Sequence, residues 1–88
     1  MSYLLPIPKL NITTGSNASA GTGTLVAGTA TISTTAVTAN SLIFLTDTSA
    51  SLTNLGSLSV SAKSAGTSFT VISTNILDTA TFNWMIVN

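Results

Sequence analysis

Apolar and polar residues alternate along much of the chain with the period of two that is typical of β-strands. The clearest example is residues 57–63. Its Leu58, Val60 and Ala62 are expected on one face, with the serines on the other. Residues 41–46 contain a continuous apolar run, which predicts a strand that is covered on both faces.

The last segment, residues 81–87, is expected to be a strand with apolar side chains on both faces. One face has to pack inside the domain, so the other needs a neighbour. Further strands are expected at 24–27, 29–34 and 68–73, with a turn or bulge at Gly28 and a hairpin at 64–67. No segment has the pattern of an amphipathic helix. The chain is therefore predicted to be all-β, a small antiparallel β-sandwich of about six short strands.

The N-terminal part has a different character. An apolar stretch is interrupted by Pro6 and Pro8, which favours extended backbone, and residues 13–23 are small, polar and spaced by glycine. We expect an extended attachment or linker segment at 1–22 and the β-sandwich domain at 23–88. The equal alternative is that the N-terminal part is an edge strand or a tail packed on the domain.

Composition excludes most catalytic and metal-binding chemistry. The 88 residues include no His or Cys, two Lys or Arg, and two Asp or Glu. The usual zinc and haem ligands and the Ser-His-Asp and Cys-His arrangements are absent, so we predict no catalytic, cofactor-binding or metal-binding residue and no enzyme. Asp78 and Lys63 have no evident pairing in the sequence and are expected to be solvated.

Two basic side chains cannot neutralise a phosphate backbone, which argues against a nucleic-acid partner. The longest apolar runs have four residues, whereas a spanning helix needs roughly 20, and no basic region precedes an apolar core as in a signal peptide.

Only 5% of the residues are charged. Either hydroxyl and asparagine side chains provide all of the solvation, or much of the surface is covered by other subunits; the second explanation fits better, because interface cores are depleted of charge. A homo-oligomer is therefore expected.

Three segments carry a resemblance to a known family. They are GTLVAGTATISTTAVTANSLIFLT at 23–46, GSLSVSAKSAGTSFTVIS at 56–73 and DTATFNWMIV at 78–87. In this order they resemble the small C-terminal β-domain of fibre and tail-fibre-like structural proteins of bacteriophages and of some large DNA viruses and virophages. The resemblance implies a homotrimeric fibre knob on the virion that serves particle structure and host attachment.

The expected partners are the chain itself, a virion or tail protein held through the N-terminal segment, and a host-surface glycan. The expected trimer interface consists of residues of the last strand: Phe82, Trp84, Met85, Ile86 and Val87. The expected exposed, receptor-facing loop residues are Asn40, Asp47, Ser49, Asn54 and Asn75.

Two other classes of function stay open at this stage. One is a capsid-decoration or assembly module without a receptor. The other is an ice-binding or adhesive β-protein, which the irregular spacing of Thr-x-Thr triplets disfavours, since lattice matching needs an even repeat.

Overall fold

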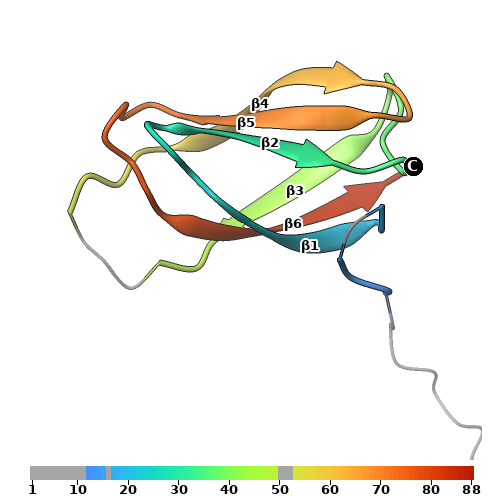
Figure 1. Ribbon diagram of the computed structural model, residues 1–88, viewed down its shortest axis with the longest axis horizontal. Helices are drawn as coiled ribbons and strands as arrows, with labels where there is room; N and C mark the ends of the chain where they lie inside the picture. Colours follow the sequence, from blue (N-terminus) through green and yellow to red (C-terminus); the bar gives the residue numbers. More distant parts are fainter. Residues whose placement is uncertain (1–11, 16, 50–52) are drawn as a thin grey trace, which may run out of the picture.

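The chain folds into two three-stranded antiparallel sheets that pack face to face, as the computed structural model shows for residues 12–15, 17–49 and 53–88 (Figure 1). Within these residues there is no helix. The first sheet has the order β1-β6-β3 and the second β2-β5-β4, which confirms the predicted six-stranded antiparallel sandwich. The strands are β1 (Ala20–Thr24), β2 (Thr29–Ser33), β3 (Leu42–Asp47), β4 (Leu58–Ser64), β5 (Ser68–Ser73) and β6 (Thr81–Val87).

The core lies between the two central strands, β5 and β6. Phe69 and Val71 of β5 face the inward residues of β6. Phe69 meets Trp84 edge to face, with the ring centroids 5.3 Å apart and the planes at 74°, a geometry that aromatic rings prefer. The predicted alternation of 81–87 is confirmed, because β6 buries every second residue: Phe82, Trp84 and Ile86.

The two glycines of strand β1 (AGTGT) leave space for aromatic side chains of the neighbouring strand β6. Gly21 lies opposite Trp84 and Gly23 opposite Phe82. A Cβ added at Gly21 would lie 2.9 Å from Cζ2 of Trp84, and one at Gly23 would lie 2.4 Å from Cζ of Phe82. Real Cβ atoms do not approach so closely, so both rings occupy the space that the glycines leave free.

This strand corrects the expected strand at 24–27, and it also spans the position after residue 22 at which the domain was expected to begin. The boundary falls inside β1, which runs from Ala20 to Thr24. The preceding residues also contact the sandwich: the Ile86 N–H donates to the Ser19 carbonyl at 2.7 Å, and the buried Thr34 hydroxyl donates to the Ala18 carbonyl at 2.6 Å. Residues 1–11 of the expected attachment segment lie outside the described residues.

A two-residue turn connects β1 to β2 across the sheets. Ala27 and Gly28 have φ values of 53° and 76°, and Val26 and Thr29 exchange backbone hydrogen bonds of 2.8 and 3.2 Å around them. Positive φ at both central positions is the geometry of a type I′ turn, in which Asn-Gly is favoured. The predicted turn at Gly28 is confirmed.

Two expectations about strand faces are wrong. A β-bulge between Val60 and Ala62 reverses the alternation of β4, so Ala62 pairs with Thr70 and is exposed, while Leu58 and Val60 stay inward. A bulge adds one residue to a strand, which moves every later side chain to the other face. Strand β3, expected to be covered on both faces, is covered on one within the chain, since Leu42 and Phe44 are exposed.

The connections gather at the two ends of the sandwich (Figure 1). One end, here called the loop end, holds the residues between β1 and β2, the described residues between β3 and β4, and those between β5 and β6. The other, the terminal end, holds the 34–41 connection, the 65–67 hairpin loop and the C-terminal Asn88. The side chain of Asn88 is anchored there: its Oδ1 accepts from the Ser41 hydroxyl at 2.5 Å, and its Nδ2 donates to the Ala36 carbonyl at 3.1 Å.

Candidate functional site

The outer face of the β1-β6-β3 sheet carries large apolar side chains. Leu42 of β3 pairs with Val87 of β6, and Phe44 pairs with Met85. Leu42 is 61% exposed, Phe44 54% and Val87 41%. These four residues form one contiguous group, called the outer apolar patch below. Such patches, when contiguous, mark interaction surfaces, because water solvates them poorly.

The patch divides the five residues expected at a trimer interface. Met85 and Val87 belong to it, whereas Phe82, Trp84 and Ile86 are buried inside the chain's own core. Because the sandwich itself covers these three side chains, they are not available to a second subunit. The two faces of β6 therefore differ: one face forms the core of the sandwich, and the other belongs to the outer apolar patch. Leu42 and Phe44 of the patch were not expected there, since β3 was interpreted as a buried strand.

The loop end brings together four of the five residues expected in exposed loops. Asp47, Ser49, Asn54 and Asn75 lie at this end, and Asn40 lies at the terminal end, in the connection that leads into β3. Two of them organise local turns: Oδ1 of Asp47 accepts from the Ser49 N–H at 2.9 Å, and Oδ1 of Asn75 accepts from the Leu77 N–H at 2.9 Å.

Asp78 holds the loop end together, contrary to the expectation that it is solvated. Its side chain is fully buried. Oδ2 accepts from the Ser73 hydroxyl at 2.7 Å and from the Gly56 N–H at 3.0 Å, and Oδ1 accepts from the Ala80 N–H at 2.9 Å. Burial raises the pKa of Asp78, but the hydrogen bonds from Ser73, Ala80 and Gly56 outweigh it and hold the pKa below its ordinary value.

The other charge expected to be solvated, Lys63, also has a specific contact. Beyond the bulge, Lys63 pairs with the inward-facing Phe69. Its Nζ donates to the Ser41 carbonyl at 3.0 Å. This contact joins β4 to the residue before β3 across the open edge of the sandwich. Both ionic groups thus serve the fold, and in the part of the chain that the structure describes no three His, Cys, Asp or Glu side chains gather as a metal site would require.

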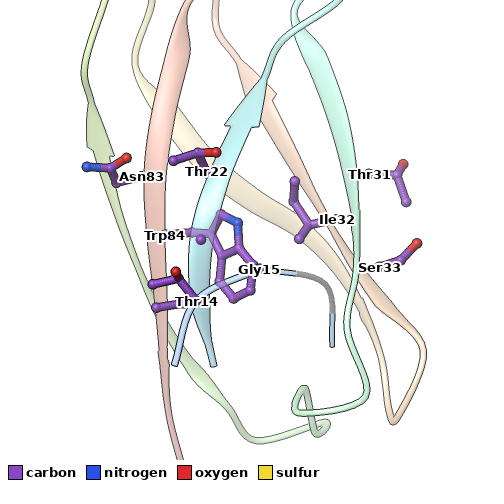
Figure 2. A pocket seen from close by; sticks show the side chains of 10 residues that line it. Thr14, Gly15, Thr22, Thr31, Ile32, Ser33, Asn83 and Trp84 are labelled. Carbon is purple, nitrogen blue, oxygen red and sulfur yellow. The ribbon is translucent and has the colours of Figure 1, made fainter. Parts of the chain in front are cut away.

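A groove of about 620 Å³ opens along the opposite long edge, between β1 and β2 (Figure 2). Both are edge strands of their sheets, so no third strand closes this side. Its polar lining comes from Thr14, Thr22, Thr31, Ser33 and Asn83, and Trp84 and Ile32 form its apolar part. We call it the β1–β2 groove.

The indole of Trp84 supplies the unusual feature of this groove. The side chain is 4% exposed, and its Nε1 has no hydrogen-bond partner among the described residues. Buried donors are almost always paired, because desolvation without a new acceptor is unfavourable. The sequence pattern predicted that Trp84 shares a face with Phe82 and Ile86, but it did not show that this is the buried face. It contains no signal for the unpaired N–H, which depends on how the second sheet lies over the ring.

Together the fold and its surface define a β-sandwich domain with one apolar sheet face and one groove whose described lining residues are uncharged. The chain belongs to the family of the C-terminal domain of K1 capsule-specific polysaccharide lyase, whose family model matches residues 17–87. This match is consistent with the resemblance to a C-terminal fibre domain and also includes the end of the segment that was expected to be a linker. No curated protein sequence matches the chain. Among the described residues, no helix has the length and apolar character needed to cross a membrane.

Proposed function

We propose that this chain is a non-catalytic structural domain of a phage tail-spike-like protein of the virion, that it assembles as a homotrimer, and that it contributes to attachment at the host surface. Family membership supports the first part, because the matched domain is named as the C-terminal part of a capsule-specific polysaccharide lyase. A capsule lies on the outside of a host cell, so such a lyase acts where a phage first meets its host.

The outer apolar patch is the observation that supports self-association, and the number of three chains comes from the resemblance to fibre knobs. Leu42, Phe44 and Val87 expose much of their apolar surface on a regular sheet face. A chain with only 5% charged residues has few charged groups that could keep this face apart from other molecules. A second copy offers a surface of the same chemistry, and symmetric assembly of identical chains is the usual way to cover it.

The chemistry of the ionic groups supports a non-catalytic role. Both oxygens of the buried Asp78 accept hydrogen bonds from neighbouring loops, and Lys63 donates to a backbone carbonyl. Asp47 accepts from the Ser49 N–H at the end of β3. Each of these groups has a role in positioning the backbone, and catalysis by any of them needs a partner acid or base.

The mass in solution tests the assembly. By size-exclusion chromatography with light scattering, we expect three times the 8.9 kDa of one chain, stable on dilution to micromolar concentration. Phe44→Glu places a charge on the outer apolar patch and should reduce the mass to that of a monomer.

The matched control is Ile76→Glu, because Ile76 is an exposed aliphatic residue at the loop end, away from the patch. It should keep the mass of the parent. A parent chain that is monomeric at micromolar concentration contradicts the homotrimer. Equal masses for parent and Phe44→Glu contradict the assigned face.

A further inference from the structure

The β1–β2 groove has the dimensions and the chemistry of a binding site. Its volume of about 620 Å³ falls within the range of small-molecule sites. Figure 2 shows the indole of Trp84 between the β1 and β2 ribbons, with Ile32 of β2 pointing toward it and the side chains of Thr31 and Ser33 on the outer side of β2. A ligand that lies along the groove therefore lies over Ile32 and Trp84, whose Nε1 is a buried donor, and reaches hydroxyl groups only at the outer rims.

The lining selects for an uncharged, hydroxyl-rich ligand. The polar side chains of the groove are threonine, serine and asparagine, and its lining, as far as the described residues form it, contains neither lysine nor aspartate. Hydroxyl groups both donate and accept, so they pair with the hydroxyls of a sugar in either sense. An acidic sugar finds no counter-charge in this groove, and a carboxylate that loses water without a partner is unfavourable.

The indole N–H is the independent observation that points to a ligand. It is a buried donor in the groove without an acceptor. A sugar hydroxyl or ring oxygen is an acceptor that fits this need. We propose that the β1–β2 groove binds a neutral oligosaccharide, with the Trp84 N–H donating to an oxygen of the ligand. This deepens the attachment role proposed above and rests on it.

An extended peptide added to the free edge of β1 is the competing occupant, and the structure disfavours it. The chain's own Thr14 already forms a parallel bridge with Ala20, and the Gly15 N–H donates to the Ala20 carbonyl at 3.1 Å. In Figure 2 the segment at Gly15 crosses the groove. Part of the β1 edge is thus paired, whereas strand addition needs a continuous row of free backbone groups.

The experiment uses Trp84 as its own reporter, because it is the single tryptophan of the chain. Neutral hexose and N-acetylhexosamine oligosaccharides of three to six units are titrated up to about 10 mM, a range suited to weak sites. A hexuronic acid oligomer and an extended Thr/Val peptide are titrated in parallel. We expect a saturable change in tryptophan emission with a neutral oligosaccharide, and no such change with the hexuronic acid oligomer or the peptide.

Variants then locate the site by calorimetry. Trp84→Phe keeps an aromatic ring but removes the donor, and should weaken binding by about tenfold; Ser33→Ala should weaken it by about threefold, the usual range for one neutral hydrogen bond. Ser59→Ala is the matched control, because Ser59 is an exposed strand serine in the separate groove between β3 and β4. It should bind as the parent does. If Trp84→Phe fails to fold, the affinities of Ser33→Ala and Ser59→Ala can still be compared, and this comparison tests whether the ligand binds in the β1–β2 groove.

Three results overturn the proposal: no saturable change with any neutral oligosaccharide, equal loss in Ser59→Ala and Ser33→Ala, or binding of the peptide in its place. Saccharide binding that survives Ser33→Ala and Trp84→Phe moves the site elsewhere and leaves the attachment role intact. Light scattering on the same samples reports the trimer separately, so failure of the groove and failure of the assembly are distinguishable.

Discussion

Replacing Asp78 by asparagine tests how the loop end is held. The change keeps the size of the side chain but leaves one carbonyl oxygen where the carboxylate has two acceptors. Ser73 and Gly56 both donate to Oδ2, and Ala80 donates to Oδ1. With Oδ1 kept, the new amide nitrogen faces the Gly56 N–H, and two donors then oppose each other in a buried place.

The magnitude follows from these contacts. A hydrogen bond to a charged group contributes about 1.5–3 kcal/mol, and an unpaired buried donor costs about 1–3 kcal/mol. The Ser73 hydroxyl can rotate and accept from the amide, which recovers part of the loss. We therefore expect Asp78→Asn to lower the free energy of unfolding by about 2–4 kcal/mol. In a domain of this size, that lowers Tm by at least about 8 °C.

The loss should depend on pH. The folded-state pKa of Asp78 lies below its ordinary value, so its stabilisation is fully present above the unfolded-state pKa of about 3.9 and is lost as the pH falls through the folded-state pKa. The difference between the parent and Asp78→Asn should therefore be constant from pH 7 to about pH 5 and shrink at lower pH.

Urea unfolding at pH 7 and at pH 2.5 measures both effects. The matched control is Asp47→Asn, the same chemical change at an exposed residue, which should stay within about 0.5 kcal/mol of the parent. Equal urea midpoints for Asp78→Asn and the parent at pH 7 would refute the reasoning. The reasoning would also be refuted if the difference between the parent and Asp78→Asn at pH 2.5 were as large as at pH 7. A difference of about 2 kcal/mol, the lower bound of the expected effect, is enough for this comparison.

Three further changes probe the packing, each by its urea midpoint. Gly23→Ala should destabilise by about 1–3 kcal/mol, because the new Cβ meets the ring of Phe82; a stability equal to that of the exposed-site control Thr24→Ala would contradict this. Ala27→Asn should stabilise by about 0.5–1 kcal/mol, because asparagine tolerates the positive φ of the turn better than alanine; any destabilisation would count against the type I′ assignment. Thr34→Val should cost about 1–3 kcal/mol, since it removes the buried hydroxyl that donates to the Ala18 carbonyl; an unchanged midpoint would show that this contact contributes nothing.

The sequence predicted the strands well where apolar alternation is strong. Strands β3 and β4 begin and end one residue later than expected, and β5 and β6 have the expected bounds. It failed at β1, because AGTGT has no apolar alternation of its own. Gly21 and Gly23 belong to a strand since the rings of Trp84 and Phe82 fill the space beside them, and that information lies about 60 residues away in the sequence.

The candidate site was less accessible from the sequence than the fold. Alternation placed Met85 and Val87 on one shared face of the last strand, but it did not show which face is the outer one. It also could not show that Leu42 and Phe44 lie beside them, because pairing between β3 and β6 is a property of sheet topology. The bulge that exposes Ala62 was also hidden, since one extra residue in a serine-rich strand leaves the pattern almost unchanged. The donors around Asp78 come from its own neighbour Ala80, from Ser73 at the end of β5 and from Gly56 in the β3–β4 connection, and the last of these contacts cannot be inferred from the local sequence.

The placement of the chain's entry and exit at one end of the sandwich has a practical consequence. Ser19 and Asn88 are both held at the terminal end, and the loops around Asp78 lie at the other. A carrier or immobilisation tag joined after Asn88 is therefore attached at the end away from those loops. In a surface-tethered assay, the loop end then points into solution, while the outer apolar patch and the β1–β2 groove lie along the sides of the tethered domain.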